Sequence, residues 1–404
     1  MAVGRSGPLT ASLSLPPASL PPPNLTAAAT GVDHSLRPAW IELDLEAIRH
    51  NTRQIRSIVG SGSKLMAVVK ANAYGHGAVP VARACLEAGA HMLAVALVQE
   101  GVELRQAGLT APILVVGTTD HHEAEAICEF GLTPSVSTWD LAAALSATAV
   151  KQGLLADCHI KIDSGMGRQG VRHDECEVFG QRLCDLPALR VAGAFSHFAS
   201  CPADVAFTDQ QVAAFLSGLA SLERGLQGQI PLRHLAASAG ILCRPDAHLD
   251  GVRPGAILYG VADSGYEDHL PRFRPAMALK ARIVSTKRLH VAESVGYGRT
   301  FRAPRETTTA LLSLGYADGI PRALSNNADV LIRGQRCPLI GRVSMDCIVV
   351  DIGDVLGAQV GDEAVLLGAQ GPERITAEEL AQRAGTCVQE IVSRMGARLP
   401  RTRL

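Results

Sequence analysis

Lys64-Leu-Met-Ala-Val-Val-Lys-Ala-Asn-Ala-Tyr-Gly-His-Gly77 joins an apolar run to a turn-rich segment. The run 65–69 predicts a buried strand, and Gly75 and Gly77 mark the turn after it. Lys70 stands where the strand ends, so its amine is attached to a rigid element and faces any site that the following loop forms. A solvated lysine that caps a strand is the plain interpretation. The alternative is an amine that binds an aldehyde cofactor as a Schiff base, which requires surroundings that lower its pKa.

The same strand-then-helix unit recurs along the next two hundred residues. Amphipathic stretches such as 79–88, 120–130 and 209–222 separate the apolar runs. Eight units of this size favour a closed (β/α)8 TIM-type barrel over an open sheet. The predicted strands are 65–69, 92–98, 112–116, 132–136, 158–162, 191–195, 232–236 and, weakest, 249–252.

Polar and glycine-rich clusters follow these strands. They include Lys70 to Tyr74, Asp163 to Arg168, Ser196-His197, Ser238 and Arg253-Pro-Gly255. Sites in such barrels lie at the carboxyl ends of the strands. The clusters therefore predict one site at that end, and they favour a chemical role for Lys70.

The two ends of the chain differ from the predicted barrel in composition and sequence pattern. Residues 1–36 are rich in Pro, Ala, Ser and Leu without periodicity, and prolines interrupt each apolar stretch, so a disordered tail is expected rather than a secretory signal. Order should begin with a strand near Trp40 and a helix over 45–59 capped by Asp44. After about residue 270, short Val- and Ile-rich runs separated by turns predict a smaller, mainly β domain. We expect a barrel over 37–270, with 37–43 free to pair with the β domain of 271–404.

Composition narrows the class of protein. The 404 residues are 47% hydrophobic and 19% charged with a net charge of −1, which gives no case for nucleic acid or an acidic membrane surface. No apolar stretch approaches the length of a membrane span. Ten scattered cysteines without a Cys-x-x-Cys pair indicate reduced thiols rather than disulfides or a metal site. A cytoplasmic enzyme without a bound metal is expected.

One motif points elsewhere. Gly165-Met-Gly-Arg-Gln-Gly170 matches the G-x-G-x-x-G pattern of dinucleotide sites. It follows the fifth strand, however, and does not open the chain's first βαβ unit, so NAD binding is a weak alternative. Arg168 within it either projects into the barrel mouth to donate to an anion or is a surface arginine beside a tight turn.

A phosphate site is predicted near the last two barrel strands. The amides of Gly255 and Ala256 can open a helix, and the hydroxyl of Ser238 precedes them along the chain. A closed barrel places its eighth strand beside its first, so Arg253 and Lys70 should be neighbours. Arg253 is otherwise a salt-bridged arginine at the barrel mouth.

Two further residues have open interpretations. Tyr297, between Gly296 and Gly298, is either a general acid or base on an exposed loop or an ordinary turn tyrosine. His197, at the end of the sixth strand, either relays a proton or is a satisfied core histidine.

Seven segments in order resemble the successive motifs of the alanine racemase family. The resemblance covers essentially everything after the N-terminal tail. It implies pyridoxal phosphate (PLP) on a (β/α)8 barrel, a C-terminal β domain, and a homodimer whose sites combine residues of both subunits. The segments are Val69-Lys-Ala-Asn-Ala-Tyr-Gly-His-Gly77, Lys161-Ile-Asp-Ser-Gly-Met-Gly-Arg168, Ser196-His-Phe-Ala199, Val252-Arg-Pro-Gly255, Gly296-Tyr-Gly298, Gly315-Tyr-Ala-Asp-Gly319 and Arg342-Val-Ser-Met-Asp346.

The resemblance also implies a role for each matching residue. Lys70 would hold PLP and act as one base, and Tyr297 from the partner subunit would be the base on the opposite face. Arg253 would face the pyridine nitrogen, and His197 would link it to Tyr297. Arg168, steadied by an often carbamylated Lys161, would contact the cofactor phenolate and the substrate carboxylate. The remaining assignments are phosphate binding by Tyr74, Ser238, Gly255 and Ala256, a substrate contact from Met345, and a guard at the entrance from Tyr316.

The chain departs from the family pattern at three positions. Ala237 replaces an asparagine before the phosphate serine, and Ser344 stands where a cysteine is common. Gln389 replaces a tyrosine that touches phosphate and narrows the substrate entrance. We therefore expect Gln389 to admit substrates larger than alanine, such as serine.

The sequence favours racemisation of L-alanine and D-alanine, which supplies D-alanine for peptidoglycan. The alternatives are an amino-acid racemase of broader specificity and a non-catalytic PLP-binding carrier or regulator. A carrier would need neither the β domain nor Tyr297. A decarboxylase on this scaffold is disfavoured because its ring nitrogen needs an acidic partner, where the resemblance places Arg253.

Overall fold

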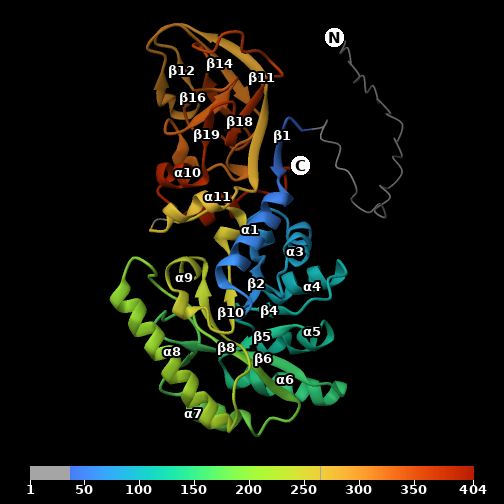
Figure 1. The fold of residues 1–404 in the computed structure, drawn as a ribbon. Helices are drawn as coiled ribbons and strands as arrows, with labels where there is room; N and C mark the ends of the chain where they lie inside the picture. Colours follow the sequence, from blue (N-terminus) through green and yellow to red (C-terminus); the bar gives the residue numbers. More distant parts are fainter. Residues whose placement is uncertain (1–36, 264) are drawn as a thin grey trace, which may run out of the picture.

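The computed structural model describes residues 37–263 and 265–404. The expected disordered tail, 1–36, lies outside the described residues. Figure 1 shows two parts, a barrel ringed by helices and a mainly β domain stacked against one end of it. The predicted fold class is therefore confirmed.

Parallel strands form the barrel, and most of them are short, largely apolar and largely buried. Their order around the barrel is β5-β4-β3-β2-β10-β9-β8-β6, and pairing of β5 with β6 closes it. All eight predicted strands are present, with shifted ends. The strands are β2 (Lys64–Val68), β3 (Met92–Val95), β4 (Ile113–Val115), β5 (Thr133–Val136), β6 (Ala156–Asp163), β8 (Leu189–Phe195), β9 (Arg233–Ala237) and β10 (Gly251–Arg253).

Helices cover the outside of the barrel. Asp44 caps α1 (Leu45–Val59) by accepting from the amide of Ala47 over 2.8 Å, as predicted. The predicted strand 92–98 is too long, because α4 already begins at Val98. The other helices of this ring are α3 (Ala78–Glu87), α4 (Val98–Gln106), α5 (Ala124–Glu129), α6 (Trp139–Gln152), α7 (Cys176–Leu183), α8 (Val205–Leu226) and α9 (Ser238–Cys243).

The seam between the first and last barrel strands brings distant segments together. β10 pairs with β2, and Val252 lies opposite Leu65. The weakest predicted strand covers 249–252. In the structure this strand, β10, begins at Gly251 and ends at Arg253. Arg253 and the residues after β2 therefore share one end of the barrel.

The β domain is built around the long strand β11 (Met277–Leu289). Its sheet also contains β1 (Ala39–Leu43), which runs antiparallel to β11 and parallel to β20 (Arg401–Arg403). Both ends of the described chain are thus joined to the same sheet. Its other strands are β14 (Thr307–Leu312), β15 (Asp329–Ile332), β16 (Gln335–Ile340), β17 (Ile348–Asp351), β18 (Glu363–Gln370) and β19 (Glu373–Ile375), and a separate ribbon pairs β12 (Ser294–Val295) with β13 (Phe301–Arg302).

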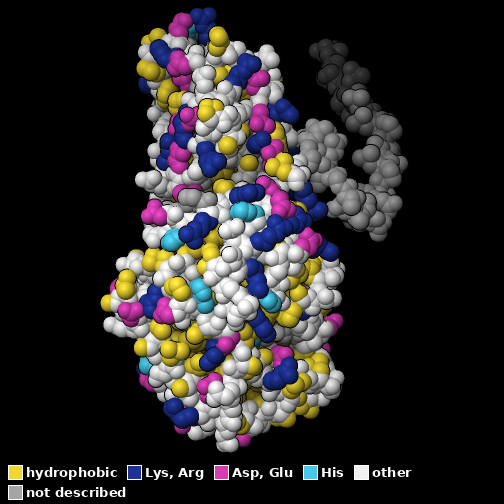
Figure 2. Space-filling view, in the orientation of Figure 1, with side chains coloured by type: hydrophobic (Ala, Val, Ile, Leu, Met, Phe, Trp, Pro, Cys, Tyr) yellow, Lys and Arg dark blue, Asp and Glu magenta, His cyan; other side chains and the backbone are white. Residues whose placement is uncertain are grey.

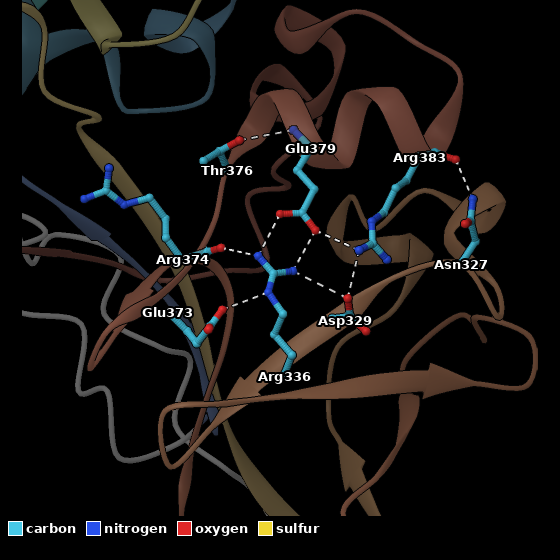
Figure 3. Close-up of polar contacts among 8 residues, drawn as sticks. All are labelled: Asn327, Asp329, Arg336, Glu373, Arg374, Thr376, Glu379 and Arg383. Carbon is cyan, nitrogen blue, oxygen red and sulfur yellow. Dashed lines mark hydrogen bonds and ion pairs between the residues drawn. The ribbon is translucent and has the colours of Figure 1, made fainter. Parts of the chain in front are cut away.

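Two helices close the C-terminal part, α10 (Ala377–Ala384) and α11 (Val388–Ser393). An ion-pair network attaches α10 to the sheet (Figure 3). The guanidinium of Arg336 on β16 reaches both carboxylate oxygens of Glu379 over 2.8 and 3.0 Å, and Glu373 over 2.9 Å. Arg383 continues the network to Asp329 over 2.8 Å. Because α11 follows α10 after a short turn, this network also helps to hold the N-terminal end of α11 in place.

Charged side chains of both signs are mixed over the face seen in Figure 2, in keeping with the net charge near zero. Within 37–263 and 265–404, the helices lack the combined length and apolar character that crossing a bilayer requires.

Candidate active site

A cavity of about 290 Å³ opens at the carboxyl ends of the barrel strands. Side chains that are far apart in the sequence meet there because parallel strands end at one edge. Ten of the predicted site residues line it: Lys70, Tyr74, Lys161, Arg168, His197, Ser238, Arg253, Gly255, Ala256 and Gln389. The geometry therefore places these residues in one site, as expected.

The backbone after Lys70 is strained. Ala71, Asn72, Ala73 and Tyr74 all have φ near 52°, so the short α2 segment (Lys70–Tyr74) contains a left-handed turn without a glycine. This conformation costs about 1–2 kcal/mol per residue. Hydrogen bonds from the following residues hold it, since the amides of Gly77 and Ala78 donate to the carbonyl and side-chain oxygens of Asn72, each over 2.8 Å. Strain that is held in this way is typical of functional sites.

The lysines of the cavity have lowered pKa values. Burial, followed by the nearby Arg168 charge, lowers the pKa of Lys70, whereas Glu100 raises it. Burial also holds the pKa of Lys161 well below its usual range, with Arg253 and Arg168 acting in the same direction. A lowered pKa increases the fraction of neutral, nucleophilic amine. The concentration of cations suits an anionic ligand.

Arg253 is held rigidly beneath the cavity. Its guanidinium donates to Nδ1 of His234 over 2.5 Å and to the carbonyls of Ser196 and Leu235 over 2.6 and 2.9 Å. Burial lowers its pKa to about 9, so it remains protonated at neutral pH. Its carbon Cζ lies 5.0 Å from the centre of the Phe195 ring.

The expected link between Arg253 and His197 is not formed within the described residues. The partners of the guanidinium are His234 and backbone carbonyls, and Arg253 also lines the cavity. Burial holds the pKa of His197 well below its usual range, with Arg253 as the next cause. His197 is therefore a neutral imidazole in the cavity wall.

A small cradle forms between Ser238 and Tyr74. The hydroxyl of Ser238 accepts from the amide of Gly255 over 3.0 Å, and a Cβ added at Gly255 would lie 2.7 Å from the Tyr74 hydroxyl. A larger residue at this position would displace the Tyr74 hydroxyl. Burial raises the pKa of Tyr74 to about 12, so its phenol keeps its proton and can donate. The predicted helix start is confirmed as a single 3-10 turn, Ala256–Tyr259.

Gln389 reaches the cavity from α11. Its amide nitrogen donates to the carboxylate of Asp263, and the backbone amide of Val388 also donates to Asp263 over 3.3 Å. Asp263 lines the same cavity. With the nitrogen held by Asp263, the side-chain oxygen of Gln389 remains as an acceptor.

Three predicted residues do not line this cavity. Tyr297, Tyr316 and Met345 are 73%, 40% and 52% exposed on the β domain. Their loops form one surface, because the amide of Tyr316 donates to the Ser344 carbonyl over 3.0 Å and Gly298 packs on Arg342. Exposed aromatic and methionine side chains gathered on one surface are typical of a contact surface.

The glycine motif is not a dinucleotide site. The amides of Gly165 and Gly167 donate to the Asp163 carboxylate over 2.9 and 3.1 Å, so they do not face a ligand phosphate. The segment leads into the short strand β7 (Val171–Arg172) rather than a helix N-terminus. The NAD interpretation is therefore wrong. Arg168 from the same loop lines the cavity.

Sequence reasoning missed several residues of the site. Phe195, Asp263 and His234 each contact a predicted site residue or line the cavity, and Glu100 accepts from the amide of Ala71, next to Lys70. His234 lies within an apolar run that is buried on both sides. The sequence therefore does not show whether the His234 side chain points into or out of the barrel. Asp263 carried no motif at all.

Comparison with known proteins assigns the family. The family described as "Alanine racemase, N-terminal domain" matches residues 43–263, and "Alanine racemase, C-terminal domain" matches residues 276–403. The alanine racemase of Desulforamulus reducens is 45% identical over 90% of this chain and 98% of its own, and that of Halothermothrix orenii is 41% identical over 90% and 96%.

Solved structures agree with the sequence relatives. The alanine racemase of D-cycloserine-producing Streptomyces lavendulae superposes with a TM-score of 0.86 at 38% identity, covering 91% of this chain and 97% of that one. The Bacillus anthracis enzyme with bound L-Ala-P gives a TM-score of 0.86 at 34% identity over 91% and 95%. The chain belongs to the alanine racemase family of isomerases.

Proposed function

We propose that this chain racemises L-alanine and D-alanine with pyridoxal phosphate bound in the barrel cavity. The observation that carries the proposal is the meeting of Lys70, Arg253 and the Ser238–Gly255 cradle in one cavity. PLP, when bound, withdraws electrons from the α-carbon of an amino acid and so makes its proton labile.

The donor set of the cavity fits this cofactor. The hydroxyls of Ser238 and Tyr74, with the backbone amide of Ala256 after β10, would suit a phosphate, whereas the Gly255 amide already donates to Ser238. Lys70, whose pKa is lowered, is the amine suited to covalent attachment of an aldehyde. Arg253, with a pKa of about 9, would keep its proton beside a ring nitrogen, which would leave that nitrogen unprotonated and discourage side reactions.

Racemisation needs a group on one face of the α-carbon that removes the proton and a group on the other face that supplies one. Lys70 Nζ is the base on one face. The partner subunit's Tyr297 is the base on the other face in a homodimer, since Tyr297 lies outside the cavity of its own chain. Tyr316 and Met345 share its surface and would complete the entrance and contact the substrate.

Lys161 supports Arg168 in this proposal. A neutral amine can attack carbon dioxide, forming an N–C bond and releasing a proton, and burial favours the neutral amine of Lys161. The resulting carbamate would be an anion beside Arg168. Arg168 would then be oriented toward the substrate carboxylate.

Serine is a second candidate substrate. The acceptor oxygen of Gln389, oriented by Asp263, can bind a side-chain hydroxyl, and Gln389 is narrower than the tyrosine usual in the family. We also propose a cytoplasmic enzyme that supplies D-alanine for peptidoglycan. The family and the reduced cysteines support this location, because the described cysteines are free thiols.

The test is to incubate the purified protein with L-alanine in deuterium oxide. D-Alanine that carries deuterium at the α-carbon is the expected product. Bound PLP without exchange would indicate the carrier instead. Absence of PLP, with Lys70 unmodified after borohydride reduction, would contradict the proposal as a whole.

A further inference from the structure

The direction of the Lys70 side chain depends on the strained backbone beside it. On its N-terminal side, the amide of Val69 donates to Ala94 on β3 over 2.8 Å, which fixes the strand end. On its C-terminal side, four consecutive residues from Ala71 have positive φ. Alanine and tyrosine do not favour this conformation. A contact outside the turn must hold its first residue.

The side chain of Glu100 makes that contact. Its Oε1 accepts from the amide of Ala71 over 2.5 Å, and its Oε2 accepts from the amides of Ala96 and Leu97 over 2.8 and 3.1 Å. Both oxygens of one carboxylate are therefore used. One caps the start of α4, and the other binds the first residue of the left-handed turn.

We propose that Glu100 is a positioning residue that holds the left-handed turn after Lys70 and so aims the Lys70 amine into the cavity. This inference rests on the proposed attachment of PLP to Lys70. Glu100 does not line the cavity and needs no contact with substrate. Its effect passes through the backbone of Ala71.

The charge of Glu100 also affects the pKa of Lys70, which provides a separate test of the proposal. Burial and Arg168 lower the pKa of Lys70, and Glu100 opposes them by raising it. The other titratable groups that share the cavity with Lys70 are Tyr74, Lys161, Arg168, His197, Cys201, Arg253, Asp263 and Tyr266. Loss of the Glu100 charge should therefore lower the pKa of Lys70 further. A residue that merely stabilised the fold would leave this pKa unchanged.

Two variants separate geometry from charge. Glu100→Gln keeps the shape but loses the charge, and its amide nitrogen cannot accept from a backbone amide. Glu100→Asp keeps the charge but is one methylene too short to reach both partners. Glu103→Gln is the matched control, because Glu103 is exposed on the same helix and its carboxylate has no hydrogen bond or ion pair among the described contacts.

The experiment measures PLP affinity of each full-length apoprotein and the rate of PLP attachment to Lys70 against pH, with thermal unfolding as the check on folding. Glu100→Gln should weaken PLP binding roughly ten- to a hundredfold and shift the midpoint of attachment to lower pH. Glu100→Asp should weaken binding while keeping the midpoint close to wild type. Glu103→Gln should match wild type in both.

The outcomes distinguish this inference from the proposed function. Failure of the wild-type protein to attach PLP at Lys70 would overturn both. Normal attachment in wild type, with Glu100→Gln indistinguishable from Glu103→Gln, would overturn the positioning role alone. A drop in melting temperature for Glu100→Gln, with unchanged affinity and midpoint, would also overturn it. If Glu100→Gln fails to fold, Glu100→Asp decides, because wild-type affinity in that variant contradicts the proposal.

Discussion

The guanidinium of Arg253 and the imidazole of His234 form a buried hydrogen bond of 2.5 Å in which Arg253 donates to Nδ1. Nδ1 must therefore be unprotonated, and Nε2 carries the proton. That proton points to Nδ1 of His159, which lies 2.8 Å away. One arginine thus fixes the tautomers of two buried histidines, and burial holds the pKa of His234 well below its usual range.

The first prediction concerns this bond. His234→Phe can keep the stacking on Phe195, whose ring centre lies 4.8 Å away, but it removes the acceptor. A buried donor without its acceptor should lower the free energy of unfolding by about 2–3 kcal/mol. His234→Gln, which retains an acceptor, should lose less. Urea unfolding of the two variants checks this, and equal losses would show that the acceptor is unimportant.

Acid should destabilise the protein through its buried histidines. Burial lowers the pKa values of His76 and His159 from 6.5 to about 4. The unfolded chain therefore binds protons that the folded chain does not, and stability falls as pH decreases from about 6.5 toward 4. Each histidine contributes up to about 1.4 kcal/mol per pH unit in that window.

The measurement is the urea midpoint at several pH values. His76→Gln should reduce the slope of stability against pH, whereas His122→Gln should not, because His122 is exposed. A slope that both variants share with wild type would assign the acid sensitivity to other groups.

The barrel was predictable because most of its strands are short, largely apolar runs. β16 was not predicted, since its residues Arg336 and Pro338 face outward and break the apolar pattern. The left-handed turn after Lys70 could not be predicted from the sequence either. No glycine marks 71–74, and the contacts that hold it come from Asn72, Gly77, Ala78 and Glu100 after folding.

The site residues also divide into those that the sequence predicted and those that it did not. Residues carried by motifs, such as Lys70 and Arg253, were found, and the strand order then placed them together. His234 was missed because a histidine in an apolar strand gives no sign of which way it faces. The direction of the Arg253 side chain was also unpredictable, so its hydrogen bond went to His234 rather than His197.

The Arg336 network should stabilise the β domain in a salt-dependent way. The Arg336 side chain is 34% exposed and binds Glu379, Glu373 and the Arg374 carbonyl together (Figure 3). Arg336→Ala should cost about 1–2 kcal/mol, more than an isolated surface pair. Arg288→Ala, which removes an exposed pair with Glu306, is the control. Thermal unfolding at low and high salt should show a loss for Arg336→Ala only, and equal effects would contradict the network.

Gln389 should widen the range of substrates. Gln389→Tyr introduces a larger, aromatic side chain and removes the amide held by Asp263. We expect kcat/KM for L-serine relative to L-alanine to fall by about tenfold, since a pocket that binds a hydroxyl gains discrimination from that bond. An unchanged ratio would show that Gln389 does not act as a gate.

Lys70 and Tyr297 should belong to the same catalytic centre only across two chains. Lys70→Ala should abolish PLP attachment and racemisation. Tyr297→Phe should keep PLP attachment, because Lys70 and the Ser238–Gly255 cradle are unchanged, but lose about 10²–10⁴ in rate. Lys64→Ala, at the exposed start of β2, is the control for lysine removal.

Mixing the two inactive variants tests the arrangement directly. If subunits exchange at random, half of the dimers pair Lys70→Ala with Tyr297→Phe. Each such dimer has one site with both residues intact, because Lys70 comes from one chain and Tyr297 from the other. About a quarter of wild-type activity should therefore return after exchange. If the two residues acted within one chain, every site in the mixture would lack one of them, and no activity would return.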